Sequence, residues 1–492
     1  MSATDLSPAP AATAAPTGHA GRTAALISLL LASMMELIDT TIVNVALPTI
    51  ERDLDASATQ LQWVVAAYPL AFAVALITGS RLGDAFGRKR LFLIGLAAFT
   101  LTSAACGLAT TADALVVFRA LQGLGAAAMI PQVMANIQVL YPPEERGRAM
   151  GAFTGLAGLA VVVGPILGAV LTSADIAGSG WRPIFLVNVP VGLLAIVAAA
   201  RFVPESRSDR RPDLALVSVL TLGAGLLAVL YPLTMGREQG WPLWVFVTMA
   251  IGVVVLARFA QSQHRHERRG GEPLVPVSLY RIRSFSAGSA VMLGLFVSMP
   301  AYFLAQTLYF QIGLGWSVLK SGLVGVPFAV VTSVCAGVGV TVLAQRIGRR
   351  VLQYGAVVLA AGALLTGVVV HAATPETSWW WFIPAMVVTG AGFGLMVAPI
   401  GLFTVADVPV SHAGAASGLF NTTTQLSAAV GVAGLGTLFF TVAQRQGRVL
   451  PVDVFAPAYE VVLLAVAACM ALAVLAAAAL PHHAPEDAPV VH

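Results

Sequence analysis

Long apolar stretches follow one another along this 492-residue chain, and they constrain its fold more than any other feature. A helix that crosses a bilayer needs roughly 20 mostly apolar residues. Only 10% of the residues are charged, whereas a soluble domain carries about 25%. The pattern predicts an all-α polytopic membrane protein with fourteen spans, at residues 24–48, 60–79, 91–110, 113–138, 149–172, 184–203, 213–234, 242–261, 285–312, 320–343, 351–371, 379–404, 412–440 and 459–480.

The basic residues predict how the chain sits in the membrane. Most of them fall in connections that share one side of the bilayer when both termini are placed in the cytoplasm, as the positive-inside rule requires. The sequence is rich in Ala, Gly and Arg and has only two lysines, Lys89 and Lys320, a composition typical of a GC-rich bacterial genome. We therefore expect a multi-pass protein of the bacterial cytoplasmic (inner) membrane, surrounded by lipid and monomeric.

The composition also excludes several kinds of partner. The basic residues do not gather on a folded domain, so no nucleic acid is expected. The three cysteines lie in separate apolar stretches, and no spacing predicts a metal site. No nucleotide loop or nucleophile triad stands out, so the chain is not expected to be an enzyme.

Two pairs of similar segments indicate an internal repeat. LGDAFGRK at residues 82–89 resembles LAQRIGRR at 343–350, and QGLGAAAM at 122–129 resembles TGAGFGLM at 389–396. Such repetition is typical of transporters built from two halves and predicts a 6+2+6 arrangement. The expected parts are a disordered cytoplasmic tail (1–22), an N-terminal six-helix bundle (23–203), two extra helices (204–261), a cytoplasmic linker (262–284), a C-terminal six-helix bundle (285–480) and a cytoplasmic tail (481–492).

Three acidic or basic residues lie well inside predicted spans, away from their ends. Glu36 and Asp39 are three residues apart in the first span and so share a helix face, and Arg119 lies in the fourth. Ionisable groups in the hydrocarbon are costly and usually functional. Two neighbouring carboxylates in a poorly hydrated cavity cannot easily both be ionised, so we predict proton exchange at Asp39, with Glu36 as a second candidate. The alternative is that these residues lie at the outer interface.

Two glycine-rich segments predict close packing and movement. Residues 79–90 read GSRLGDAFGRKR, which combines glycines spaced by four with a cluster of opposite charges suited to a conformational latch. Residues 149–172 contain small residues that allow helices to touch and a proline that kinks the helix. The predicted latch comprises Gly79, Gly83, Asp84, Gly87, Arg88 and Lys89. The predicted packing motif comprises Gly155, Gly158, Gly164, Pro165 and Gly168.

The remaining polar residues of the spans are mostly uncharged. A cavity lined by such groups suits hydrophobic or amphipathic cargo better than sugars. The candidate substrate-binding residues are Asn44, Tyr68, Gln122, Asn136, Gln306, Tyr309, Asn421 and Gln425.

These motifs together resemble the major facilitator superfamily, and within it the fourteen-span drug:proton antiporter family. The matching segments are IDTTIVNVALPTI (38–50), GSRLGDAFGRKR (79–90), LVVFRALQGLGAA (115–127), GLAVVVGPILGAVL (158–171), WRPIFLVNVPVG (181–192) and PLVPVSLYRIRSF (273–285). Three positions depart from the family pattern: Pro183 follows Arg182 in place of an aromatic residue, Ala169 replaces a second glycine, and Gln345 takes the place of Asp84 in the second repeat.

The resemblance implies a proton-coupled exporter of drugs, antibiotics or secreted metabolites that works by alternating access. It implies proton coupling at Asp39 supported by Arg119, and a latch at Asp84 and Arg88 that stabilises one access state. It also implies that the helix carrying Gly164 and its neighbours seals the cavity. The proton gradient would be the energy source, with no cofactor.

Two alternatives remain open. The first is an importing symporter of the same fold, which energised cells would reveal by accumulating the substrate. The second is a non-transport sensor or a channel, and a channel would show uncoupled, non-saturating flux.

Overall fold

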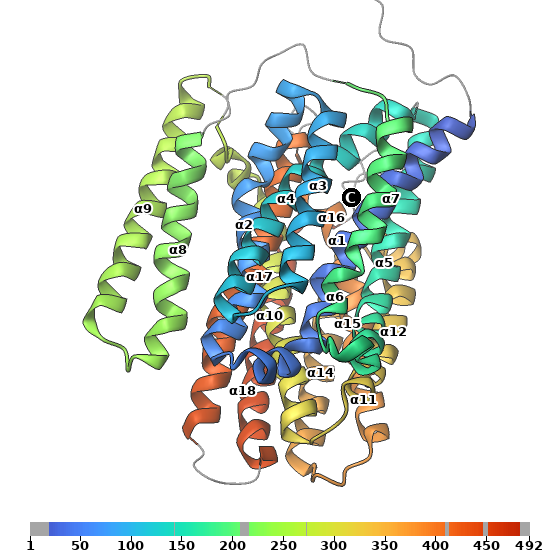
Figure 1. The fold of residues 1–492 in the computed structure, drawn as a ribbon. Helices are drawn as coiled ribbons and strands as arrows, with labels where there is room; N and C mark the ends of the chain where they lie inside the picture. The colour runs from blue at the N-terminus through green and yellow to red at the C-terminus, as the bar shows by residue number, and fades with distance from the viewer. Residues whose placement is uncertain are drawn as a thin grey trace, which may run out of the picture.

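The computed structural model describes residues 19–141, 143–206, 216–271, 273–408, 413–445 and 451–482. Every regular element in these ranges is a helix, and the long helices run side by side as one tall bundle (Figure 1). Thirteen helices within the described residues are long and apolar enough to cross a membrane. The remaining predicted span corresponds to α5, Pro143–Ala174, whose second part, Val163–Ala174, is an apolar helical segment. The predicted all-α polytopic fold is confirmed.

The first half of the chain forms a bundle whose helices begin at clear local signals. Ser57 caps the second helix in a reciprocal capping box with Gln60, and Thr111 caps the fourth. The sixth predicted span is interrupted at Val187. The elements are α1 (His19–Leu54), α2 (Ala58–Phe86), α3 (Arg88–Gly107), α4 (Ala112–Leu140), α5 (Pro143–Ala174), η1 (Ile176–Gly178), α6 (Pro183–Leu186) and α7 (Asn188–Phe202).

Two further helices, α8 (Leu216–Glu238) and α9 (Leu243–Arg268), form a hairpin that stands apart at the left of Figure 1. Only α8 packs closely against the main bundle, at α2 and α17, while α9 pairs with α8 and touches the short connection after it. Val217 and Leu243 are more than three-quarters exposed. In a membrane protein, such apolar surface faces lipid.

The second half repeats the arrangement of the first with more interruptions. Two of its spans contain a π-helical turn, and two are divided by short breaks. The elements are η2 (Val277–Arg281), α10 (Arg283–Leu308), η3 (Tyr309–Gly313), α11 (Val318–Val324), α12 (Val326–Val338), η4 (Gly339–Leu343), α13 (Ala344–Ile347), α14 (Arg350–Ala372), η5 (Trp379–Phe382), α15 (Ile383–Val397), α16 (Pro399–Thr404), α17 (Ala413–Arg445) and α18 (Pro451–Ala477).

The two halves meet along two main seams. Helix α2 packs against α17, and α5 packs against α11 and α12. A smaller contact joins α1 to the second half, where the Gln311 amide donates to the Val45 carbonyl over 2.8 Å. The predicted tail 1–22 lies largely outside the described residues, but α1 already begins at His19. Residues 483–492 of the predicted C-terminal tail also lie outside them.

The repeated segments take equivalent positions in the two halves. Gly87 and Gly348 both have positive φ, 110° and 59°, and each precedes an arginine whose backbone N–H is bound by the segment that follows the last helix of its half. Arg88 donates to the Ser206 carbonyl over 2.8 Å, and Arg349 donates to the His482 carbonyl over 3.0 Å. The sequence repeat therefore corresponds to a repeated backbone connection.

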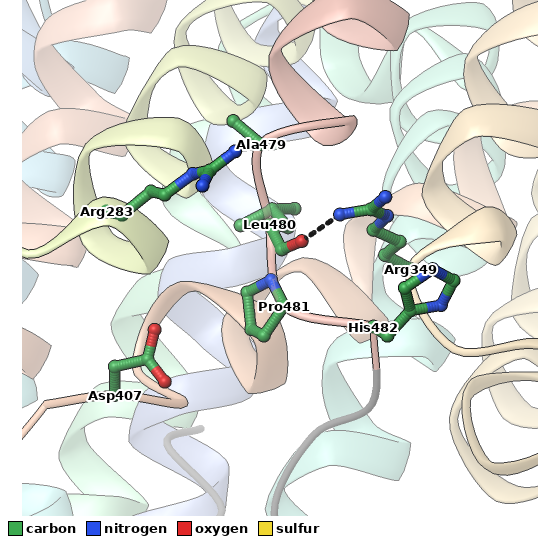
Figure 2. A pocket seen from close by; sticks show the side chains of 7 residues that line it. All are labelled: Arg283, Arg349, Asp407, Ala479, Leu480, Pro481 and His482. Atoms are coloured by element: carbon green, nitrogen blue, oxygen red, sulfur yellow. Dashed lines mark hydrogen bonds between the residues drawn. The ribbon is translucent and has the colours of Figure 1, made fainter.

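Figure 2 shows this connection in the second half. The Arg349 guanidinium also donates to the Leu480 carbonyl, which anchors the residues just after α18. A cavity of about 250 Å³ opens beside it. It is lined by Arg283, Arg349, Asp407, Ala479, Leu480, Pro481 and His482.

The contact between α2 and α4 depends on a glycine. A Cβ atom on Gly79 would lie 2.0 Å from the Ala127 carbonyl oxygen, which is backbone and cannot turn away. We expect Gly79→Ala to force the two helices apart and destabilise the protein by about 1–3 kcal/mol, the usual cost of overpacking. Thermal unfolding in detergent measures the loss.

The matched control is Gly434→Ala in α17, where an added Cβ has no atom within 4 Å. This variant should unfold at or above the wild-type temperature, because alanine favours helix over glycine. Equal unfolding temperatures for Gly79→Ala and the wild type would contradict the packing argument.

Candidate functional site

A buried ion pair joins α1 to α4 inside the first bundle. Asp39 is fully buried and Arg119 is 2% exposed, and Arg119 Nη1 lies 2.5 Å from Asp39 Oδ2. An arginine within the hydrocarbon must find an anion or carbonyl partner. Here it finds both, because Nε also donates to the Val64 carbonyl over 3.3 Å. The Arg119 side chain is therefore buried inside the protein and paired there.

The second carboxylate oxygen of Asp39 accepts two amide donors. Gln122 Nε2 and Asn188 Nδ2 each lie 2.9 Å from Oδ1. The side-chain carbonyl oxygen of Gln122, Oε1, in turn accepts a hydrogen bond from Arg119 Nη1 over 2.8 Å. A buried ion pair is tolerated when its charges are hydrogen-bonded to further groups, and here Asp39 Oδ1 and the Arg119 guanidinium both have such partners.

A second shell of contacts holds the donors in place. Asn188 also donates to Ser103 Oγ over 2.9 Å, and that hydroxyl donates to the Phe185 carbonyl over 2.9 Å. Sequence analysis missed Asn188, Ser103 and Phe185 as site residues. The signal was present in the segment WRPIFLVNVPVG, where a single amide stands among apolar residues.

Glu36 lies one turn before Asp39 and has its own partner. The Tyr68 hydroxyl donates to Glu36 Oε1 over 3.0 Å, and Glu36 is 5% exposed. The Tyr68 ring also faces the Arg119 guanidinium, whose Cζ lies 4.6 Å from the ring centroid. A cation over an aromatic face is attracted to it, so Tyr68 connects Glu36 to the ion pair.

The predicted latch residues lie together at one end of the first bundle. Asp84 accepts from the Arg88 guanidinium over 2.8 and 3.0 Å, while the Lys89 backbone and side chain reach Glu205 and the Ala200 carbonyl. Sequence analysis missed Glu205, whose carboxylate also lies 3.7 Å from Arg90. The glycines serve close approach, because an added Cβ on Gly83 would meet the Gln132 side chain and one on Gly87 would meet Glu205.

The packing motif brings α5 against α1 just beyond Asp39. A Cβ on Gly164 would overlap the Thr41 hydroxyl, and one on Gly168 would lie within 3 Å of Ile42. On its other side α5 meets Gly322 of the second half near Pro165. Gly155 and Gly158 lie in α5, in a part whose side-chain surroundings are outside the described region.

The candidate substrate residues are spread over helices of both halves. Tyr68 and Gln122 belong to the network around Asp39, whereas Asn136 donates to the Gln132 carbonyl within the first bundle. The others lie on α1, α10, η3 and α17, and they are Asn44, Gln306, Tyr309, Asn421 and Gln425. Among the described residues, Asn44 Oδ1, Asn136 Oδ1 and the Tyr309 hydroxyl have no hydrogen-bond partner. A substrate-binding role for this set remains a prediction.

The second bundle has a neutral counterpart of the ion pair. Met386 on α15 takes the position of Arg119 in the sequence repeat. Its sulfur lies 3.1 Å from Gln306 Nε2 and 3.6 Å from the Tyr302 hydroxyl, both on α10. The same contact between first and fourth helices thus forms without charge, so the ion pair is not a packing requirement of the fold.

Two helical bundles with one buried charge network define a membrane transporter of the two-half type. The described part of the chain matches this class in its seams, its repeated connections and its buried carboxylates.

The chain belongs to the Major Facilitator Superfamily, whose model matches residues 29–432. It is 41% identical to the probable actinorhodin transporter of Streptomyces coelicolor, over 89% of this chain and 76% of that protein. It is 33% identical to the tetracenomycin C resistance and export protein of Streptomyces glaucescens, over 87% of this chain and 77% of that protein. Among solved structures, a bacterial homologue of the human drug peptide transporters PepT1 and PepT2 superposes with a TM-score of 0.63 at 14% identity, over 92% of this chain and 98% of that one.

These findings confirm the superfamily and its drug-exporter branch, which the motifs predicted. They also confirm a multi-pass transporter of small compounds and the expectation that the chain is not an enzyme. The structural likeness, at 14% identity, shows the fold alone.

The ion pair generates a prediction about stability. Replacing Arg119 by methionine, the residue of the second bundle, leaves Asp39 buried without its cation. Breaking a buried pair from one side costs about 3–5 kcal/mol, so Arg119→Met should lower the unfolding temperature in detergent markedly.

The double variant Asp39→Asn/Arg119→Met removes both charges and imitates the neutral second bundle. It should regain most of the lost stability, because no uncompensated charge remains. A double variant as unstable as Arg119→Met would mean that the arginine acts through its size and not its charge.

Proposed function

We propose that this protein is a proton-coupled antiporter that exports small hydrophobic or amphipathic compounds across the bacterial cytoplasmic membrane. The observation that supports the proposal most directly is the fully buried Asp39 carboxylate, paired with Arg119 and one turn from Glu36. An ionisable group that is shielded from lipid and fully hydrogen-bonded in one state is suited to exchange a proton in another.

The proposed mechanism is alternating access of the two bundles. A proton from outside neutralises Asp39 and weakens its attraction to Arg119, and this favours the state open to the cytoplasm. Substrate enters from the cytoplasm or the inner leaflet, and proton release accompanies the return. A ligand shifts such an equilibrium only by the difference in its affinity for the two states, so the proton and the substrate must each prefer one state.

Two contacts are suited to the outer end of this cycle. Gln311 of the second half bonds the backbone of α1 at Val45, six residues beyond Asp39. Helix α5 meets Gly322 at Ala169 and Pro165. With both termini in the cytoplasm, these contacts lie on the outer side and must separate for release.

The proposed cargo follows from the character of the spans and from the relatives. The polar candidates within the spans are mainly amides and hydroxyls, which suit an amphipathic molecule. Relatives are named as transporters or exporters of actinorhodin and tetracenomycin C. We propose that the cargo is an antibiotic, a drug or a similar secreted metabolite, and that a monomer transports it.

Reconstituted transport tests the proposal. In proteoliposomes with an imposed pH gradient, the wild type should drive movement of a hydrophobic dye against its concentration gradient. Asp39→Asn should reduce this to the rate seen without a pH gradient, because the side chain can no longer take up or release a proton.

The control is Asp453→Asn, which removes an exposed carboxylate in the first turn of α18 and should leave the rate unchanged. Gradient-driven transport that persists in Asp39→Asn would remove this residue from the coupling mechanism. Dye movement in the direction of the proton would identify an importing symporter, and non-saturating flux would identify a channel.

A further inference from the structure

Helix α7 touches both the buried ion pair and the latch, and Asn188 is its contact with the ion pair. On the basis of the proposed function, we propose that Asn188 is a positioning residue that holds the Asp39 carboxylate. When Asp39 gains or loses its charge, Asn188 shifts α7, and this shift reaches the latch. The inference rests on contacts at both ends of this helix.

At the first end, three donors converge on one carboxylate. Arg119 binds Oδ2, while Gln122 and Asn188 bind Oδ1. A protonated carboxyl group is neutral and carries an O–H donor of its own, which needs an acceptor. Because hydrogen bonds to an ionised carboxylate are the stronger ones, protonation of Asp39 weakens its hold on all three donors.

The contacts of the donors indicate which one moves. Arg119 and Gln122 lie on the same helix, bond each other over 2.8 Å and are held further by the Val64 carbonyl. Asn188 comes from a different helix, and its other bond goes to Ser103, whose hydroxyl binds the Phe185 carbonyl next to the break before α7. Release of Asn188 thus frees the start of α7, whereas release of the others does not.

At the second end, the α7 segment holds the latch. Lys89 Nζ donates to the Ala200 carbonyl over 2.7 Å, and the Arg88 backbone N–H donates to Ser206 just after the helix. Helix α7 has 15 residues and is therefore about 22 Å long. A helix moves as a rigid element, so a shift at Asn188 reaches the latch.

Other titratable groups around Asp39 must be kept constant in any test. The groups that face it are Glu36 on α1, Tyr68 on α2, Cys106 on α3 and Arg119 on α4. Asn188 and Ser103 do not titrate, so substitutions there leave each of these groups in place. A changed pH response then reports the hydrogen bonds to Asp39.

The experiment compares Asn188→Ala with the wild type in two measurements across pH. The first is the pH profile of gradient-driven dye efflux from proteoliposomes. The second is hydrogen exchange of the backbone around residues 86–91 and 203–206 at the latch. In the wild type, the efflux rate and the hydrogen exchange at the latch should both change with pH around the same midpoint.

Asn188→Ala removes a donor to the charged form of Asp39. We expect the efflux midpoint to move upward by about one pH unit, since a hydrogen bond to a charged group is worth roughly that much. We also expect hydrogen exchange at the latch no longer to share its pH midpoint with efflux, because the hydrogen bond that links Asp39 to α7 is gone. Ser103→Ala should move the midpoint in the same direction by less, and it provides the test should Asn188→Ala fold poorly.

Thr102→Ala is the matched control, because Thr102 lies beside Ser103 and its hydroxyl bonds only carbonyls of its own helix. It should keep both wild-type midpoints. A wild-type midpoint in Asn188→Ala and Ser103→Ala, or latch exchange that still follows efflux in Asn188→Ala, would overturn the inference. If the proposed function itself is wrong, wild-type efflux will not depend on the pH gradient. That result is distinct from the results that overturn the inference.

Discussion

The buried pair of Asp39 and Arg119 is the interaction on which the first bundle's polar structure depends. Two charges removed from water are stable only when they meet at close range and are hydrogen-bonded by further groups. The structure meets this demand with residues from five helices, since Tyr68, Ser103 and Asn188 add contacts from α2, α3 and α7. The pair and its partners therefore link these five helices to one another.

Close helix packing makes this convergence geometrically feasible. An added Cβ on Gly123 would lie 2.4 Å from the Tyr68 carbonyl, and one on Gly125 would lie 2.8 Å from the Phe99 backbone. Small residues allow backbones in a membrane to approach closely. Helix α4 thus lies near enough to α2 and α3 for Arg119 to reach across to α1. The charge network therefore depends on the glycines of α4.

The two bundles share their backbone plan but differ in chemistry. Arg88 and Arg349 anchor equivalent connections to the end of each bundle, and each bundle has a contact between its first and fourth helices. In the first bundle this contact is an ion pair, and in the second it is the Met386 sulfur with Gln306 and Tyr302. Among the described residues, the buried charges therefore lie in the first half, which supports assigning proton exchange there and leaves the second half to other roles.

The sequence by itself determined the membrane class, the spans and the internal repeat, because apolar length, charge placement and glycine spacing are local properties. It also singled out Asp39, Arg119 and Glu36, since an ionisable residue in an apolar stretch is conspicuous. Only the tertiary structure decided that Asp39 pairs with Arg119, that Tyr68 serves Glu36, and that Asn188 and Glu205 belong to the two clusters. These contacts join residues as many as 149 positions apart, and the depth, rotation and spacing of helices that create them are set by packing and cannot be read from the pattern of any one span.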